Sequence, residues 1–275
     1  MNHVARRLGP QALAAAFVIA FAAPAQPQTP ATPGKPGAKG RPATPATAAA
    51  GPAETRFRLV LNGSLAPSTQ SYNDVRTPIA YAEPSTIRTG YETGTGFGFD
   101  AAVQASFYRG LGVLVGYSLV TRDTAGSVDV SRPHPLYLNR PRTASAELSS
   151  YGYSESAADL DVAYARRAGR LDWAVFAGVT LFRVEADLLS APTFDERYPY
   201  DTLAIVATPA AAADGDATGF NVGGRLDYLI GRSMGVGVQL RYATASIGLS
   251  AGADASDVTI DVGGFSVGAG VRFYF

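Results

Sequence analysis

The sequence of 275 residues has no cysteine, only two methionines and a single tryptophan. Without cysteine the chain cannot form structural disulfides, thiolate metal sites or a cysteine nucleophile. Lysine plus arginine and aspartate plus glutamate each total 23, so the net charge gives no indication of nucleic-acid binding. Long helical patterns are also missing from Thr55 onward. We therefore expect no disulfide scaffold, no cofactor or metal centre and no nucleic-acid partner.

Glycine and aromatic residues are abundant instead. The chain contains 30 glycines, 14 tyrosines and 13 phenylalanines. This composition is typical of glycine-rich aromatic strands rather than of helices built from leucine, alanine, glutamate and lysine. It predicts an all-β protein.

The N-terminal region differs from the rest of the chain. Arg6 and Arg7 precede an apolar stretch at 12–23, which ends in Ala-Pro-Ala before Gln26. A basic start, a short apolar stretch and small residues at the cleavage site predict a signal peptide over 1–25. Residues 26–53 are rich in proline and alanine and lack acidic and aromatic residues, which predicts a disordered periplasmic linker.

Apolar and polar residues alternate repeatedly after the linker, which is the period of a strand with one apolar face. We predict about eight strands, with ten as the alternative. The segments are 56–65, 97–108, 111–120, 158–166, 171–182, 220–230, 235–244 and 266–275.

The connections between these segments alternate between short and long. Tight turns are predicted at 109–110, 167–170 and 231–233. Long joins occupy about 66–95, 121–157, 184–218 and 248–258. Short periplasmic turns, long extracellular loops and an even strand number are the pattern of a membrane barrel. We therefore predict a single closed antiparallel transmembrane β-barrel over 54–275.

The last strand keeps its apolar face to the final residue. Val271, Phe273 and Phe275 alternate with Arg272 and Tyr274. If this face contacts lipid, the first and last strands must pair, because an open sheet edge is too costly in hydrocarbon. We therefore expect Phe275 at the membrane interface, where aromatic rings prefer to lie.

This terminal strand resembles that of the small outer-membrane β-barrel proteins of Gram-negative bacteria, including OmpA-like barrels. The resemblance implies an outer-membrane location, reached through the inner membrane after signal cleavage. It also implies that the barrel assembly machinery reads Phe273 and Phe275, with periplasmic chaperones as further partners during biogenesis. It leaves the activity open.

The same alternation places charged residues inside the barrel. An eight-stranded barrel is only wide enough for side chains to fill it, and buried charges must be paired or wet. We predict a lumen plugged by an ion-pair network, with a narrow porin-like channel as the alternative. The predicted network contains Arg56, Arg58, Asp100, Asp159, Asp161, Asp172, Arg225, Asp227, Arg241 and Arg272.

Catalysis has weak support in the sequence. Barrels that modify lipid A need a histidine beside a serine and an acid, and after signal removal the chain keeps only His134, between two prolines. A general base must be held near its nucleophile, so we expect a solvated loop histidine and no enzyme. A lipid-A-modifying enzyme is the least favoured alternative.

The 121–149 segment carries arginines that match phosphate geometry. We predict Arg132, Arg140 and Arg142 as contacts for lipopolysaccharide phosphates. The expected partners are therefore outer-membrane lipids and lipopolysaccharide, and we expect a monomer with a structural or surface-interaction role.

Overall fold

The computed structural model describes residues 57–249 and 258–275, and its regular elements are all strands. The predicted signal peptide, the linker and Arg56 lie outside the described residues. In the described ranges no helix is long and apolar enough to cross a membrane.

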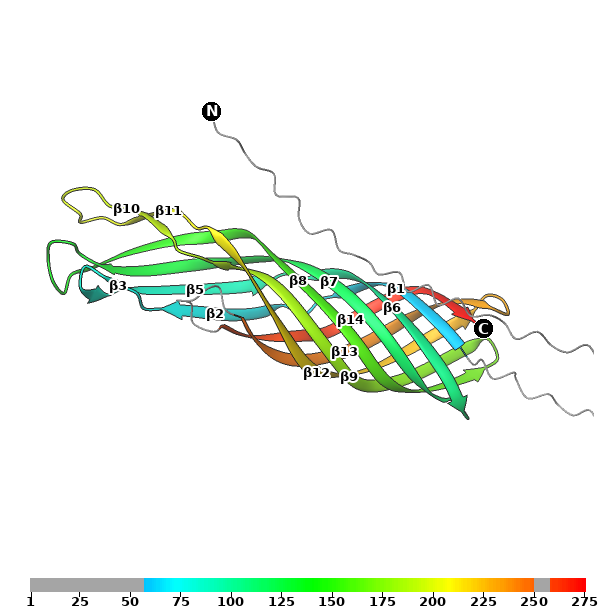
Figure 1. Cartoon of the computed structure of the whole chain (residues 1–275). Coiled ribbons are helices and arrows are strands. Elements are labelled where there is room, and N and C mark those ends of the chain that lie inside the picture. Colours follow the sequence, from blue (N-terminus) through cyan, green and yellow to red (C-terminus); the bar gives the residue numbers. More distant parts are fainter. Residues whose placement is uncertain (1–56, 250–257) are drawn as a thin grey trace, which may run out of the picture. The chain divides into compact units, whose positions relative to one another are not determined.

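Eight strands form a ring in which each strand pairs antiparallel with two neighbours (Figure 1). Their order is β7-β6-β1-β14-β13-β12-β9-β8, and β8 pairs back onto β7. The first strand pairs with the last, from Arg58 opposite Tyr274 to Leu65 opposite Val267. The predicted eight-stranded antiparallel barrel is therefore confirmed. The ring strands are β1 (Phe57–Ala66), β6 (Gly96–Tyr108), β7 (Leu111–Pro133), β8 (Pro141–Ala168), β9 (Leu171–Leu189), β12 (Ala210–Leu229), β13 (Met234–Leu249) and β14 (Val258–Tyr274).

Short turns join the ring strands at the end of the ring that holds the C-terminus (Figure 1). Two residues separate β6 from β7, two separate β8 from β9, and four separate β12 from β13. The turn between β6 and β7 places Gly110 at a φ of 92°, a backbone conformation that glycine adopts without steric cost. The three predicted tight turns are confirmed.

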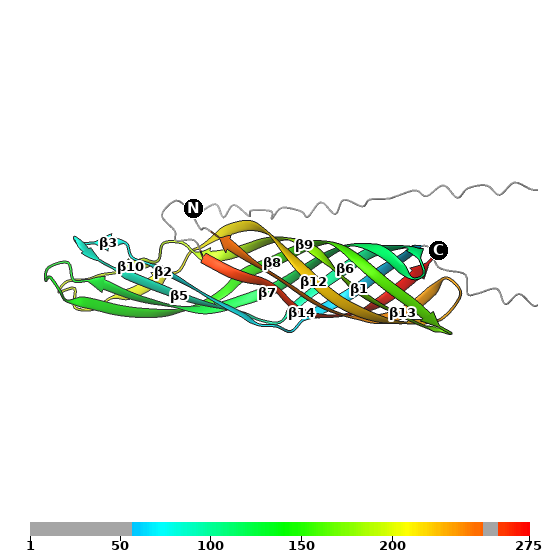
Figure 2. The ribbon, with the colours of Figure 1, turned by 90° about the horizontal axis from the view of Figure 1, so that it is seen from below.

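The predicted long loops are wrong for most of their residues, because the strands continue far past the ring (Figure 2). β7 and β8 pair as far as Pro133 opposite Pro141. β5 (Thr86–Thr93) pairs with β7, and β2 (Gln70–Arg76) pairs with β5, which extends the sheet to ten strands. Two small hairpins complete the fold, β3 (Ile79–Ala80) with β4 (Glu83–Pro84) and β10 (Thr193–Asp195) with β11 (Ala204–Ala207).

Along each long strand, alternate residues keep pointing inward and outward, but the chemistry of the two faces is exchanged. The outward face changes from apolar to charged, and the inward face changes from charged to apolar. On β9, Val175, Val179 and Leu181 point outward and are at least half exposed. Arg183 and Glu185, farther along the same strand, also point outward and are exposed. We call the segment with an apolar exterior the ring part and the segment with a polar exterior the distal part. The distal part comprises β2, β5 and residues 121–133, 141–157, 183–189, 210–217, 243–249 and 258–262.

The interior of the distal part is an apolar core. Val184, Leu188 and Ile260 are almost fully buried there. The rings of Tyr72 and Tyr91 stack with centroids 4.8 Å apart. Burial raises the pKa of the Tyr91 hydroxyl to about 12. Leu189 donates its backbone N–H to this hydroxyl at 2.7 Å, so the polar end of the ring is not left unpaired.

Candidate functional site: the charged lumen

The lumen of the ring part is lined by charged and amide side chains. Nine of the ten residues predicted for the ion-pair network are described, and each points inward. Eight of them are buried, and Arg241 is partly buried. They come from seven ring strands, so the network links segments that are far apart in the sequence.

A proximal cluster lies near the short turns. Arg272 donates to Asp227 at 2.8 Å, and Arg225 approaches the other oxygen of the same carboxylate at 3.2 Å. Arg58 pairs with Asp172 at 2.5 Å. Gln104 accepts hydrogen bonds from Arg58, at 3.3 Å, and from Arg225. These contacts join the two ion-pair groups into one buried cluster.

A middle cluster surrounds Asp159. Arg241 pairs with this carboxylate at 2.5 Å, and the hydroxyl of Thr180 donates to it at 2.7 Å. Asn221 donates to Asp161 at 2.8 Å and to the Thr180 hydroxyl at 2.9 Å. The cluster therefore has two carboxylates and one guanidinium, and neutral amide and hydroxyl donors complete the hydrogen bonding.

Asn62 extends the proximal cluster toward Asp100. Its side-chain oxygen accepts a hydrogen bond from Arg272 at 2.5 Å, and its side-chain nitrogen donates to Asp100 at 2.7 Å. Uncharged polar residues were missing from the sequence prediction, which counted only charges. Their inward position on predicted strands was the signal that could have identified them.

A third group lies where the lumen meets the distal core. Glu155 accepts hydrogen bonds at 3.2 Å from the Tyr153 hydroxyl and from the backbone N–H of Gly263. Arg122 donates to the carbonyls of Ser68 and Gly263. Arg122 is 5% exposed. The sequence predicts a long loop at this position, but the alternation continues along β7 and turns Arg122 inward.

A small cavity separates the middle cluster from this third group. It has a volume of about 40 Å³, and its lining includes Asp100, Arg122, Glu155 and Arg241. A polar cavity of this size has room for ordered water that bonds to the groups lining it.

The predicted lipopolysaccharide contacts lie at the end of the distal part farthest from the ring, around the turn between β7 and β8. We call this end the tip. Arg142 and Arg132 pair with Glu196 at 2.7 and 3.1 Å, and Arg140 pairs with Asp201 at 3.3 Å. Arg142 is buried, whereas Arg140 keeps 61% of its side chain exposed. Two of the three guanidiniums are thus committed to one carboxylate of the chain itself.

Glu196 is held ionised by its neighbours. Burial by itself would raise its pKa, but hydrogen bonds from Tyr81 and Arg142 and the charge of Arg132 lower the pKa below its ordinary value. Arg132 also stacks over the rings of Tyr81 and Phe194. Glu196 therefore links its own segment, between β10 and β11, to Tyr81 between β3 and β4, to Arg132 on β7 and to Arg142 on β8.

His134 lies in the turn between β7 and β8, but the expectation that it is solvated is wrong. Its side chain is fully buried against Tyr137. One ring nitrogen accepts the backbone N–H of Leu136 at 3.1 Å, and the other lies 3.8 Å from Asp201. In the part of the chain that the structure describes, no serine or threonine hydroxyl hydrogen-bonds to His134.

The terminal aromatic residues sit at the seam between β1 and β14. Phe275 donates its backbone N–H to the carbonyl of Phe57 at 3.0 Å, while 75% of the residue stays exposed. Phe273 pairs with Leu59 across the same seam. The predicted assembly signal thus lies on the strand pair that closes the ring.

The chain resembles small outer-membrane barrels among solved structures. These include OprG from Pseudomonas aeruginosa (13% identity, 80% of this chain and 96% of that chain, TM-score 0.45) and Neisserial surface protein A (12%, 80% and 97%, 0.39). The outer membrane protease OmpT from Escherichia coli is similar at 9% identity (80% and 97%, 0.40). No family model matches the chain, and no curated protein matches it significantly. At such identities and TM-scores, these likenesses say nothing about what this chain does.

Proposed function

We propose that the chain is an integral outer-membrane β-barrel protein with a structural or surface-interaction role and a lumen that does not conduct. The ring part spans the bilayer, with the short turns in the periplasm and the distal part outside the cell. The export signal and the linker precede the barrel, which the barrel assembly machinery inserts.

The observation that carries this proposal is the polarity of the ring part. Its exterior is covered by exposed apolar side chains on all eight strands, among them Phe99, Val115, Val175 and Val238, which are each about half exposed. Its interior holds the charged clusters. A protein surrounded by water would have the reverse arrangement, because exposed apolar patches of this extent are rare on soluble proteins. An outward apolar band around a polar interior is the pattern of a membrane barrel.

Two layers support a closed lumen. The charged clusters fill the ring part from Arg58 near the short turns to Asp159 in the middle. The distal core then covers the outer end with apolar side chains such as Val184 and Leu188. An ion crossing this protein would have to separate the buried ion pairs and also pass an apolar barrier.

A narrow channel is the second candidate. Several buried polar atoms of the lumen lack a hydrogen-bond partner, including two nitrogens of Arg225, one nitrogen of Arg272 and one oxygen of Asp172. Such groups favour ordered water nearby. A file of water along them would support a proton or cation path if the distal core opened.

The same observations favour a non-catalytic role. The histidine that an acyl-transfer site would need is packed at the tip, where a backbone N–H occupies one ring nitrogen. Its neighbour Asp201 could orient it, but catalysis would require a hydroxyl within reach of the other nitrogen. We propose instead that the tip acts as a rigid contact surface.

The test is single-channel recording on the refolded protein in planar bilayers, with a gel-shift assay for heat-modifiable folding on the same sample. We expect a folded, heat-modifiable barrel without discrete conductance steps. Reproducible steps that depend on Asp227 would favour the channel. Recovery of the folded protein as a soluble species without detergent or lipid would overturn the membrane assignment.

A further inference from the structure

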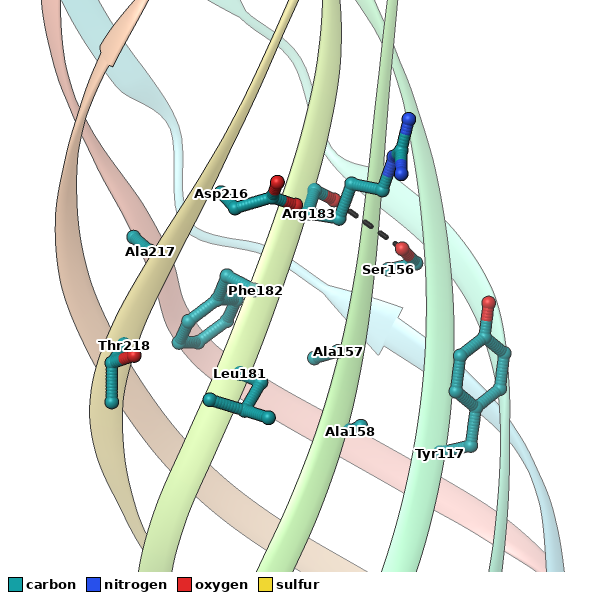
Figure 3. A pocket seen from close by; sticks show the side chains of 10 residues that line it. All are labelled: Tyr117, Ser156, Ala157, Ala158, Leu181, Phe182, Arg183, Asp216, Ala217 and Thr218. Atoms are coloured by element: carbon teal, nitrogen blue, oxygen red, sulfur yellow. Dashed lines mark hydrogen bonds between the residues drawn. The ribbon is translucent and has the colours of Figure 1, made fainter.

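Large apolar side chains gather on the surface in two separate regions of the chain. The first is the outer wall of the ring part. It ends on β9, where the outward Leu181 is followed by the outward Arg183 beside a depression in the wall (Figure 3). The second region is the tip. Its exposed apolar residues, which we call the apex residues, have exposed fractions between 56% and 80% and are Ile79, Leu136, Tyr137, Leu138 and Tyr198.

A polar wall separates the two regions. A strand rises about 3.3 Å per residue, so the ten steps from Thr121 to Ser131 on β7 cover roughly 33 Å along the strand. On the proposed function, on which this inference rests, the acyl chains around the ring part therefore cannot cover the apex residues. The outward residues of this stretch are small, hydroxyl-bearing or acidic: Thr121, Asp123, Ala125, Ser127, Asp129 and Ser131.

The apex residues lie on three turns that meet at the tip. One belongs to β3, three belong to the turn between β7 and β8, and one belongs to the turn between β10 and β11. Both ribbon views place these turns at the same end of the strands (Figures 1 and 2). Glu83 accepts the backbone N–H of Asn139 at 3.0 Å, and Arg142 donates to the carbonyl of Tyr200 at 3.1 Å. These bonds hold the turns together, so the apex residues are presented by a fixed scaffold.

The tip has no net formal charge. Counted over 79–84, 132–142 and 194–204, it has four arginines and four carboxylates. All four arginines pair with carboxylates of the tip itself. A neutral surface of this kind has no long-range attraction for a polyanion or a polycation. Removal of apolar surface from water is the main gain that the apex residues offer a partner.

The residue types at the apex favour a lipid bilayer over a protein as that partner. Leucine is under-represented among the residues that dominate protein–protein binding, and a protein partner needs a broad complementary surface. Fluid acyl chains, in contrast, adapt to side chains that project from separate turns. Leucine inserts its side chain among acyl chains at a membrane interface, and tyrosine lies at the level of the headgroups.

We infer that the apex residues insert into a second lipid bilayer, distinct from the one that holds the ring part, and that this contact needs no anionic lipid. The leucine and isoleucine side chains enter the acyl region, and the tyrosine rings lie at its boundary with the headgroups. The surface-interaction role proposed above thereby gains a partner of defined chemistry.

Co-flotation with lipid vesicles tests this contact. The refolded protein is placed in nanodiscs, whose bilayer surrounds the ring part, and phosphatidylcholine vesicles supply the second bilayer. We expect discs that hold the protein to float with the vesicles and empty discs to stay behind. Adding phosphatidylglycerol to the vesicles should change the bound fraction by less than about twofold, because the tip is neutral. Wild-type discs that do not float, or that float only with anionic vesicles, would overturn the inference.

Variants locate the contact. Leu138→Ser should weaken vesicle binding about tenfold, as expected when one leucine side chain is no longer buried. Val206→Ser on β11 is the control, because Val206 is 59% exposed but is not an apex residue, and it should bind like the wild type. Equal affinities of the two variants would overturn the assignment to the apex.

A fluorescent reporter measures the depth of insertion. In a Trp173→Phe background, Leu138→Trp should be quenched by vesicles brominated in the acyl chains, whereas Ser127→Trp on the polar wall should not. Absence of quenching in Leu138→Trp would overturn the inference. Discs that pair tip to tip without vesicles in electron micrographs would also overturn it, since the apex residues would then bind a second copy of the chain.

Nanodisc assembly separates this inference from the proposed function. Each variant should enter discs and migrate as a folded, heat-modifiable barrel before vesicles are added, because the changed side chains are exposed. If the folded wild-type protein enters discs that then ignore vesicles, only the inference about the tip fails. If the protein folds as a soluble species without detergent or lipid, the membrane assignment itself fails.

Discussion

The two halves of β9 have the same backbone pairing and opposite side-chain chemistry. From Leu171 to Leu181 the outward residues are apolar, and the inward residues include Asp172 and Thr180. From Arg183 to Leu188 the outward residues are charged, and the inward ones are Val184, Ala186 and Leu188. No change of register accompanies the inversion, because β9 stays paired with β12 throughout.

This comparison shows that backbone pairing and side-chain polarity carry separate information. The hydrogen-bonded ladder has to be complete in both halves, since unpaired backbone groups are costly in lipid and in a protein interior. Side chains then decide which medium lies outside. On the proposed function, the step between Leu181 and Arg183 marks the membrane surface on this strand.

The two interiors are also stabilised differently. The distal core buries apolar surface, which contributes about 25 cal/mol per Å² removed from water. The lumen buries ion pairs, whose desolvation offsets most of their attraction. We infer that the distal core supplies more of the stability, whereas the lumen network fixes which strands pair.

The largest expected effect is loss of a shared carboxylate in the lumen. Asp227→Asn leaves Arg225 and Arg272 without their common partner, and removing one member of a buried pair costs about 3–5 kcal/mol. Urea unfolding in lipid vesicles would measure it. Asp123→Asn, on the exposed outer face of the distal part, is the control, with an expected change within about 0.5 kcal/mol. Equal effects of the two changes would contradict the plugged lumen.

The next largest effect should come from a cation on the outer wall, which should destabilise the ring part and not the distal part. Val175→Arg and Val238→Arg place a charge on the exterior of the ring part, at a cost of about 2–4 kcal/mol near the bilayer midplane. Ser127→Arg, on the exterior of the distal part, should fold like the wild type. The same vesicle unfolding assay compares the three. A harmless Val175→Arg together with a destabilising Ser127→Arg would invert the assignment of the two halves.

Replacing a glycine in the lumen by alanine should destabilise the barrel more than replacing a glycine on the outer wall. A Cβ at Gly237 would lie 2.1 Å from a carboxylate oxygen of Asp227, whereas a Cβ at Gly63 would meet nothing within 4 Å. Gly237→Ala should therefore cost about 1–3 kcal/mol through overpacking. Gly63→Ala should leave the unfolding midpoint unchanged. A stable Gly237→Ala barrel would mean that the lumen packs less tightly than the structure indicates.

The smallest effect is confined to the tip. Because the pKa of Glu196 is lowered in the folded state, its stabilising contribution is complete above the unfolded-state pKa. It is lost as pH falls below the ordinary carboxyl range through the lowered folded pKa. Limited proteolysis should then cut the tip at acidic pH while the ring part stays intact. Glu196→Gln should show this cleavage already at neutral pH, and a resistant variant would contradict the role of Glu196.

The sequence predicted the ring better than the distal part for a physical reason. Alternation with aromatic and aliphatic residues marks strands such as 171–182 clearly, and parity placed residues such as Asp172 and Arg272 in the lumen. Residues 183–188 alternate equally well, but their charged outward face is also typical of an exposed loop. The pairing of Arg58 with Asp172, 114 residues apart, could not be predicted, because it depends on how the ring brings β1 and β9 face to face.

The central claim, that the polarity inversion marks the membrane surface, is tested most directly by tryptophan fluorescence in vesicles of brominated lipids. The chain has one tryptophan, Trp173, so Trp173→Phe gives a silent background. Val179→Trp and Glu185→Trp then place one reporter on either side of the inversion on the outward face of β9. The account predicts strong quenching at 179 by bromine in the acyl chains and almost none at 185. Equal quenching at both positions would contradict it.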